Sequence, residues 1–224
     1  MSKTKTNKDL VKQAHRAVEL LEQAYPDPEC SLCYKKPHEL LMSVRLAAQC
    51  TDARVNMVTP ELFETYKTPQ DFALADVADV ERIIASCGLY KTKARDLVGI
   101  GKMLTEEFGG QVPDTMEELL RLPGVGRKTA NLVLGDVFGK PAVVCDTHCI
   151  RITNLLGLTV GKDATKVEMQ LRNILPMDRA NDFCHRLVLH GRAVCVARRP
   201  QCGNCVLNVC CDHALGLAAQ GKGK

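Results

Sequence analysis

The 224-residue chain has no run of about 18 apolar residues, the length that a membrane-spanning helix requires. Its first residues lack the charged and then apolar pattern of a secretory signal peptide. Twelve cysteines without a secretion signal indicate a reducing compartment or bound metal. We therefore expect a protein that lies inside the cell, in the cytoplasm or nucleoid if the source is a prokaryote, and that has no membrane partner.

A persistent alternation of apolar and polar residues, which would predict strands, is also missing, and no internal repeat is detectable. Apolar residues recur instead at helical spacing, so the expected fold is all-α. The short apolar run at 141–145 is expected to be extended without forming a sheet, and the chain ends at 1–8 and 214–224 are expected to be irregular. The predicted helices span about 10–25, 37–48, 52–62, 77–87, 94–108, 115–122, 127–138, 147–156, 167–175 and 180–191.

Charge and apolar content set broad limits on the protein. Lys and Arg outnumber Asp and Glu by 30 to 26, a net charge of +4. This mild excess is compatible with nucleic-acid binding but does not establish it, so the placement of charge has to carry that argument. With 46% apolar residues, the chain can bury a sizeable core, as one large domain or two small ones.

The stretch 122–130, Leu-Pro-Gly-Val-Gly-Arg-Lys-Thr-Ala, predicts a tight hairpin between two helices. A capping-box pattern starts the first helix at 115, and the proline and glycines end it near 122. Apolar spacing over 130–138 predicts the second helix, from Arg127. Backbone N–H groups in such a hairpin are expected to point outward unpaired, where they can bind a phosphate. The residues concerned are Gly124, Val125 and Gly126.

Lys128 lies in the first turn of the second predicted helix and off its apolar stripe. The positive end of the helix dipole disfavours a protonated amine, and a partly neutral amine is a nucleophile. On position alone, the alternative is a solvated lysine beside a tight turn.

Four cysteines near the C-terminus have the spacing Cys195-x6-Cys202-x2-Cys205-x5-Cys211, with Pro and Gly in the intervening loops, and can converge on one centre. Zinc commonly occupies four-cysteine sites, but structural zinc sites usually have two tight pairs and only one is present here. The wider spacings suit a cubane iron–sulfur cluster better. Cys210 leaves the last ligand open, and four buried reduced thiols are the alternative to a metal site.

Arginines accompany this cysteine cluster: Arg192 lies just before its first loop, and Arg198 and Arg199 lie within that loop. A loop that is pinned at both ends would hold its arginines rigidly, which suits contact with phosphates. A solvated basic loop is the alternative.

Cys30 and Cys33 form an isolated C-x-x-C with no second pair nearby. We interpret them as two reduced thiols rather than a metal or redox site.

Together these segments resemble the endonuclease III family of DNA base-excision glycosylases over about residues 10 to 213. The resemblance rests on 122–131, on Val-Cys-Asp-Thr-His at 144–148, where Cys145 interrupts the usual aliphatic run, and on the cysteine spacing. The further matches are Ala-Gln-x-Thr-Asp at 48–52, Gly-Leu-Tyr-x-x-Lys-Ala at 88–94 and Leu-His-Gly-Arg at 189–192.

The resemblance implies two helical lobes. A central bundle at 30–140 carries the hairpin, and residues 1–29 with 141–224 form a second lobe that holds the cluster loop. DNA would lie across the cleft between them with the damaged base flipped into it. We expect a monomer that acts on double-stranded DNA carrying damaged pyrimidines or abasic sites.

It also implies a bifunctional DNA glycosylase and abasic-site lyase of base excision repair. Lys128 attacks the sugar C1′ of the flipped nucleotide and expels an oxidised pyrimidine, while Asp146 accepts the lysine's proton or stabilises charge on the sugar. The resulting Schiff base acidifies the 2′ proton, and β-elimination cuts the strand on its 3′ side. A plain helix N-cap is the alternative role for Asp146.

By the same resemblance, Gln49 and Leu89 enter the duplex and fill the hole that flipping leaves. Cys50 stands where the family usually has a small residue in this loop, and Cys87 directly precedes the Gly-Leu-Tyr segment. These two departures from the family pattern leave the preferred lesion open. His148 is expected to be structural. The ligands of a [4Fe-4S] cluster with a structural, DNA-positioning role are implied to be Cys195, Cys202, Cys205 and Cys211, rather than Cys210.

Two other functions remain open. A monofunctional adenine-mismatch glycosylase shares the cluster and the aspartate but generally lacks the hairpin lysine and has an extra C-terminal domain, so Lys128 and the chain length disfavour it. A non-catalytic DNA-binding or electron-transfer iron–sulfur protein has no need for Lys128 and Asp146 together.

Overall fold

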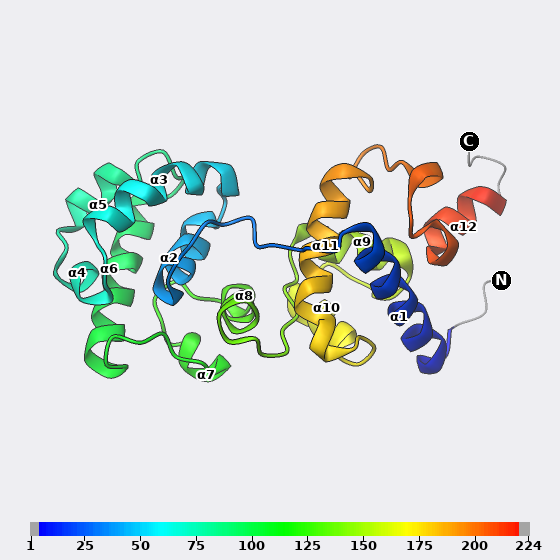
Figure 1. Cartoon of the computed structure of the whole chain (residues 1–224), viewed down its shortest axis with the longest axis horizontal. Coiled ribbons are helices and arrows are strands. Elements are labelled where there is room, and N and C mark those ends of the chain that lie inside the picture. The colour runs from blue at the N-terminus through cyan, green and yellow to red at the C-terminus, as the bar shows by residue number, and fades with distance from the viewer. Residues whose placement is uncertain (1–4, 220–224) are drawn as a thin grey trace. The chain divides into compact units, whose positions relative to one another are not determined.

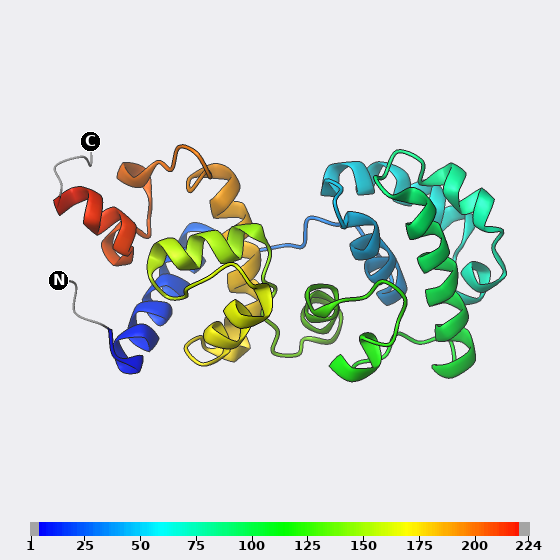
Figure 2. The same cartoon turned by 180° about the vertical axis from the view of Figure 1, so that it is seen from behind.

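The computed structural model describes residues 5–219, and all regular structure within that range is helical, which confirms the all-α prediction (Figure 1). The chain forms two compact units: residues 30–139, here called the hairpin unit, and residues 5–29 with 140–219, the cysteine-loop unit. Figure 2 shows the helices of each unit from behind. Within the described range, no helix is both long and apolar enough to cross a membrane.

In the hairpin unit, short helices surround one long helix, α6. Helices α4 and α5 pack on α6, and α2 packs against α3, α6 and α8. Leu40 and Leu41 of α2 and Leu97 and Ile100 of α6 are fully buried, so this contact forms the centre of the core. The helices are α2 (Pro37–Ala47), α3 (Asp52–Thr65), α4 (Pro69–Leu74), α5 (Val77–Ile83), α6 (Tyr90–Glu107), α7 (Met116–Leu119) and α8 (Arg127–Phe138).

Local capping chemistry explains where several of these helices begin and end. Pro37 starts α2 as predicted, and the Thr51 hydroxyl accepts a 3.3 Å bond from the Arg54 N–H to cap α3. Gly110, with φ of 78°, ends α6 as its N–H donates to the Leu104 carbonyl. Helix α4 was not predicted, because its six residues are too few to show a helical period.

In the cysteine-loop unit, α1 and α9 pack against α11. Their contact buries Ala14, Val18 and Leu21 of α1 with Phe183 and Leu187 of α11. Residues 142–145 are buried and form no strand, as expected. The helices are α1 (Asn7–Ala24), α9 (Thr147–Leu156), α10 (Ala164–Arg172), η1 (Met177–Arg179), α11 (Ala180–Ala193), η2 (Cys202–Asn204), η3 (Asn208–Cys210) and α12 (Asp212–Ala219).

The expectation of irregular chain ends is wrong for their described parts. Residues 1–4 and 220–224 lie outside the described range, but α1 begins at Asn7 and α12 covers Asp212–Ala219. The Lys5 ammonium donates to the Asp212 carboxylate (2.6 Å) and to Gln13 (2.7 Å). These bonds stabilise both ends against each other, and local composition gives no sign of a partner so far away in the sequence.

Glu22 ties α1 to the elements that pack on it. Its carboxylate accepts a 2.7 Å bond from the Arg179 Nε of η1 and a 3.4 Å bond from Arg186 of α11. The hydrogen bond from Arg179, followed by the charges of both guanidinium groups, holds the pKa of Glu22 below its usual value.

Candidate active site

The hairpin between α7 and α8 turns at Gly124, whose φ of 68° only glycine adopts readily. Helix α7 ends at Leu119, earlier than predicted. The expectation that all hairpin amides are unpaired is wrong, because the Val125 N–H donates to the Leu122 carbonyl (3.1 Å) and the Val125 side chain is buried. Gly126 is extended and caps α8 without any side-chain bond, so no N-cap side chain competes with a ligand for the first amides of α8.

Lys128 is exposed in the first turn of α8. The buried face of this helix carries Ala130, Val133 and Leu134, so the predicted separation of the lysine from the apolar stripe is confirmed. Its amine is therefore open to a ligand that approaches the helix N-terminus.

An ion pair between α2 and α6 packs against the hairpin at Gly124. The Arg45 Nε of α2 donates to the Asp96 Oδ2 of α6 at 2.7 Å, and both side chains are less than 20% exposed. A Cβ atom at Gly124 would clash with the Arg45 side chain and lie 2.6 Å from the Asp96 Oδ2. The close seating of Gly124 on this pair fixes the hairpin relative to α2 and α6.

Gln49 and Leu89 share an unusual backbone conformation. Among the non-glycine residues described, they alone have positive φ, 54° and 60°. Both side chains are exposed, Leu89 by 57%. A Cβ atom at Gly88 would lie 3.4 Å from the Gln49 carbonyl oxygen, so the two loops run against each other. Strained backbone of this kind clusters at sites of function.

Asp146 is the N-cap of α9, the alternative role that the sequence left open. Its Oδ1 accepts a 2.7 Å bond from the Cys149 N–H, and the side chain is half-buried. Asp146 belongs to the cysteine-loop unit and Lys128 to the hairpin unit. A cap bond occupies one carboxylate oxygen and is compatible with a further role for the charge.

The four predicted ligand cysteines line one small pocket together with Leu155 and Ala214 of α9 and α12. Cys210 does not line it, and its thiol donates to the Leu207 carbonyl instead (3.5 Å). Burial raises the pKa of the Cys205 thiol to about 11. Within residues 5–219, no three His, Cys, Asp or Glu side chains converge closely enough to hold a single metal ion. The four cysteines thus share the lining of one pocket.

Two side chains that the sequence analysis did not single out contact these cysteines. Arg151 of α9 donates to the Cys195 carbonyl (2.5 Å) and Sγ (3.5 Å), and its other nitrogen lies 3.2 Å from the His148 Nδ1. The His190 Nε2 lies 3.3 Å from the Cys205 Sγ, and burial lowers the pKa of His190 to about 4. His190 is part of the Leu-His-Gly-Arg segment, so that motif was an available signal.

The predicted phosphate-binding arginines lie on the surface of the same unit. Arg192 is in the last turn of α11, Arg198 and Arg199 are in the following loop, and all three are exposed. The Gln201 N–H donates to the Val194 carbonyl (3.0 Å) and closes that loop.

The isolated C-x-x-C segment contains two cysteines that form no disulfide, and their interpretation as reduced thiols stays a prediction. Cys33 is exposed, whereas burial raises the pKa of Cys30 to about 12. This high pKa keeps Cys30 a protonated and unreactive thiol.

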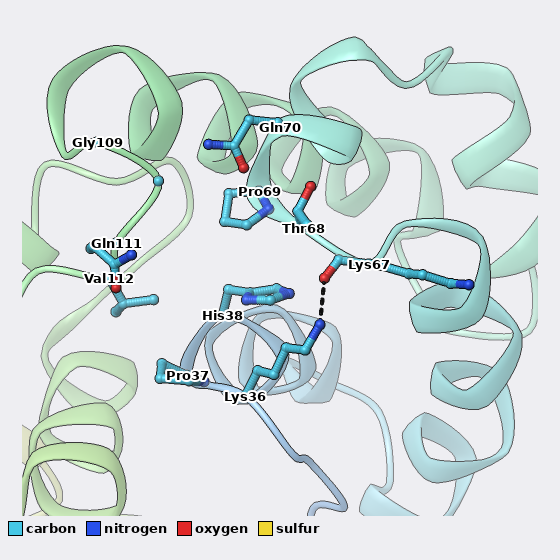
Figure 3. Close-up of a pocket in the computed structure, with 11 residues that line it drawn as sticks. Lys36, Pro37, His38, Lys67, Thr68, Pro69, Gln70, Gly109, Gln111 and Val112 are labelled. Carbon is cyan, nitrogen blue, oxygen red and sulfur yellow. Dashed lines mark hydrogen bonds between the residues drawn. The ribbon is translucent and has the colours of Figure 1, made fainter.

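A further pocket in the hairpin unit contains none of the predicted site residues (Figure 3). It lies between the start of α2, the start of α4 and the chain after α6, and His38 points into its middle. The Lys36 ammonium donates to the Lys67 carbonyl (3.0 Å) on one side. We assign this pocket no part in the reaction.

Comparisons with known proteins agree with this arrangement. The model of the HhH-GPD superfamily, described as base excision DNA repair proteins, matches residues 42–177. The chain is 44% identical over 209 residues to an endonuclease III of Synechocystis, covering 92% of this chain and 95% of the relative. An endonuclease III of Bacillus subtilis is 41% identical, with 90% and 92% covered.

A solved structure gives the same result for the fold. A trapped endonuclease III–DNA covalent intermediate superimposes with a TM-score of 0.86 at 39% identity, covering 93% of this chain and 98% of that chain. With the helical fold, the hairpin and these relatives in place, the chain belongs to the endonuclease III family of the HhH-GPD superfamily.

Proposed function

We propose that the protein is a DNA glycosylase and abasic-site lyase of base excision repair that removes oxidised pyrimidines from double-stranded DNA. The observation that carries the proposal is the exposed Lys128 amine in the first turn of α8, directly after the hairpin. A helix N-terminus without a side-chain cap attracts a phosphate and brings a sugar close to that amine. Family membership supplies the reaction class.

In this mechanism, the Lys128 Nζ attacks C1′ of the flipped nucleotide and the glycosidic bond breaks. The base leaves with its electron pair and is protonated. Asp146 accepts the proton from the attacking amine or offsets positive charge on the ring. The nitrogen lone pair then opens the ring: the bond between C1′ and O4′ breaks, O4′ takes up a proton, and a protonated imine forms between Lys128 and C1′. This cation acidifies the 2′ hydrogen, and removal of that hydrogen as a proton expels the 3′ phosphate by β-elimination.

Gln49 and Leu89 are proposed to enter the duplex where the nucleotide has left. Flipping removes stacking and pairing, and an amide with an apolar wedge restores part of both. Their exposure and their adjacent left-handed backbones support this role. The backbone of Gly124, Val125 and Gly126 and the three surface arginines, Arg192, Arg198 and Arg199, are proposed to bind the DNA phosphates.

A [4Fe-4S] cluster is proposed to occupy the space that Cys195, Cys202, Cys205 and Cys211 line. The chemistry of the donor set fits: four thiols, an apolar lining, and neighbours in Arg151 and His190 that can donate to sulfur. Cys195, Cys202, Cys205 and Cys211 would supply the four thiolate ligands. When bound, the cluster would cross-link the loop and so present Arg198 and Arg199.

Borohydride trapping tests the reaction. The wild-type protein should form a covalent adduct with an oligonucleotide duplex that contains an abasic site or thymine glycol, because borohydride reduces the imine to a stable amine. Lys128→Ala should still bind the duplex but form no adduct.

The same assay separates the alternatives. A monofunctional adenine-mismatch glycosylase would release a base with little adduct, and a non-catalytic protein would only bind. Undiminished adduct with Lys128→Ala would contradict the proposed nucleophile. We further propose that the enzyme acts as a monomer in the cytoplasm or nucleoid, where the DNA of a prokaryote lies.

A further inference from the structure

Lys93, near the start of α6, is the only lysine among residues 5–219 that is buried, with 0% of its surface exposed. Removing an ammonium group from water is unfavourable unless polar partners replace the water. Its partners therefore indicate what keeps this lysine in the core.

The side chain and the backbone of Lys93 each donate a hydrogen bond, one to the end of α2 just before Gln49 and the other to Leu89. Its Nζ donates a 2.8 Å hydrogen bond to the carbonyl of Leu46, in the last turn of α2 just before Gln49. That carbonyl is among those that a helix leaves without an internal partner. The backbone N–H of Lys93 donates to the carbonyl of Leu89 (3.1 Å). One residue thus binds the Leu89 backbone and the base of the loop that carries Gln49.

The surroundings of Lys93 link it further to these loops. Cys50 follows Gln49, and the thiols of Cys50 and Cys87 are both close enough to the ammonium group to act on its pKa. Burial raises the pKa of Cys87 to about 11 and lowers the pKa of Lys93. Besides burial, the groups acting on the Lys93 pKa are the two thiols and Arg45. The direct hydrogen bond of the ammonium group goes to the Leu46 carbonyl at the end of α2 and not to a carboxylate.

We propose that Lys93 is a positioning residue for DNA distortion. It holds the backbones of Gln49 and Leu89 in their left-handed conformations before DNA binds, so that both side chains are ready to enter the duplex together. The inference rests on the insertion of Gln49 and Leu89 in the proposed function, and it adds a residue that touches neither the DNA nor the reacting sugar.

Two trapping substrates test this role. In the first, an abasic site faces a normal base; in the second, it faces an abasic analogue, so that no opposite base needs support. Lys93→Met should lower the trapping rate on the first duplex by roughly ten- to a hundredfold, the effect of a small misplacement, and much less on the second. The ratio of the two rates is the readout, because it does not depend on the fraction of folded enzyme.

Two further variants complete the experiment. Lys93→Gln keeps a hydrogen-bond donor and should partly restore the ratio, whereas Leu104→Ala, a core change elsewhere on α6, should lower thermal stability and leave the ratio unchanged. Equal losses on both duplexes, or a changed ratio in Leu104→Ala, would overturn the positioning role. Loss of adduct specific to Lys128→Ala is a separate result that tests the nucleophile and not Lys93.

Discussion

Gly124 and Gly126 are two residues apart, but they have different physical roles. Gly124 has a left-handed backbone and rests on the Arg45–Asp96 pair, whereas Gly126 is extended and a Cβ atom there would meet open space. The first glycine is required by the fold, and the second leaves room for a ligand to approach the amides of α8.

Alanine at Gly124 should therefore affect stability, whereas alanine at Gly126 should affect DNA binding. Gly124→Ala should lower the free energy of unfolding by about 1–3 kcal/mol because of backbone strain and the clash beneath it. Gly126→Ala should leave stability nearly unchanged but weaken binding to an abasic-site duplex. Thermal unfolding and a fluorescence anisotropy titration measure the two quantities. If Gly126→Ala binds DNA as wild type does, close phosphate contact at this glycine is wrong.

At the level of elements, the loop between α11 and α12 contains all four of the proposed cluster ligands. Its regular structure is limited to three-residue helical turns between Ala193 and Asp212, and its main-chain bonds are short-range, as from the Cys205 N–H to the Cys202 carbonyl. Cys211 lines the shared pocket, whereas Cys210 beside it bonds to Leu207.

Substitution of Cys211, with Cys210 as the control, tests which of the two neighbouring cysteines binds the cluster. Cys211→Ser should lose the visible thiolate-to-iron charge-transfer absorption and weaken DNA binding, because a ligand is removed. Cys210→Ser should keep both. Absorption spectra and iron content of the purified variants check this. The reverse pattern would make Cys210 the ligand, and absorption retained in both would contradict the ligand set.

The hydrogen-bonded pair of Glu22 in α1 and Arg179 in η1 predicts a pH dependence of stability. Because Arg179 lowers the pKa of Glu22 in the folded state, the contribution of Glu22 is fully present above the usual carboxyl pKa and is lost as pH falls through the lowered value. The stability difference between wild type and Glu22→Gln should thus be constant near neutral pH and shrink on acidification below about pH 4.3. Urea unfolding at several pH values measures it. A difference that grows on acidification would contradict the assignment.

Elements with local signals were predictable from the sequence, and those with remote partners were not. The hairpin, the start of α2 and the Thr51 cap depend on prolines, glycines and hydroxyls within a few residues. Helix α12 and the role of Lys93 depend on contacts with Lys5 and Leu46, far away along the chain. Gln49 and Leu89 were found only through family resemblance, because nothing in the residues themselves predicts a left-handed backbone.

On the scale of the whole molecule, the two proposed catalytic groups come from different units. Lys128 lies in the hairpin unit and Asp146 in the cysteine-loop unit, and the proposed mechanism assigns a role to each. Each unit has its own core, and the chain passes between them near residues 29 and 140.

The charge of Asp146 can be separated from its capping role. Asn is also a good N-cap, so Asp146→Asn should keep α9 stable while it removes the carboxylate. We expect base release from thymine glycol to slow by roughly a hundredfold or more, with a smaller effect on trapping at an abasic site that is already formed. Asp146→Ala should lose stability as well. Normal base release by Asp146→Asn would show that Asp146 acts only as the N-cap of α9.

The most direct test of the account is to locate the covalent bond to DNA. After borohydride trapping on an abasic-site duplex, the adduct is digested with protease and nuclease and the modified peptide is sequenced by mass spectrometry. The account predicts a deoxyribose-derived mass on Lys128 and on no other amine at comparable yield. A modification at another lysine or at the terminal amine, with Lys128 unmodified, would contradict it.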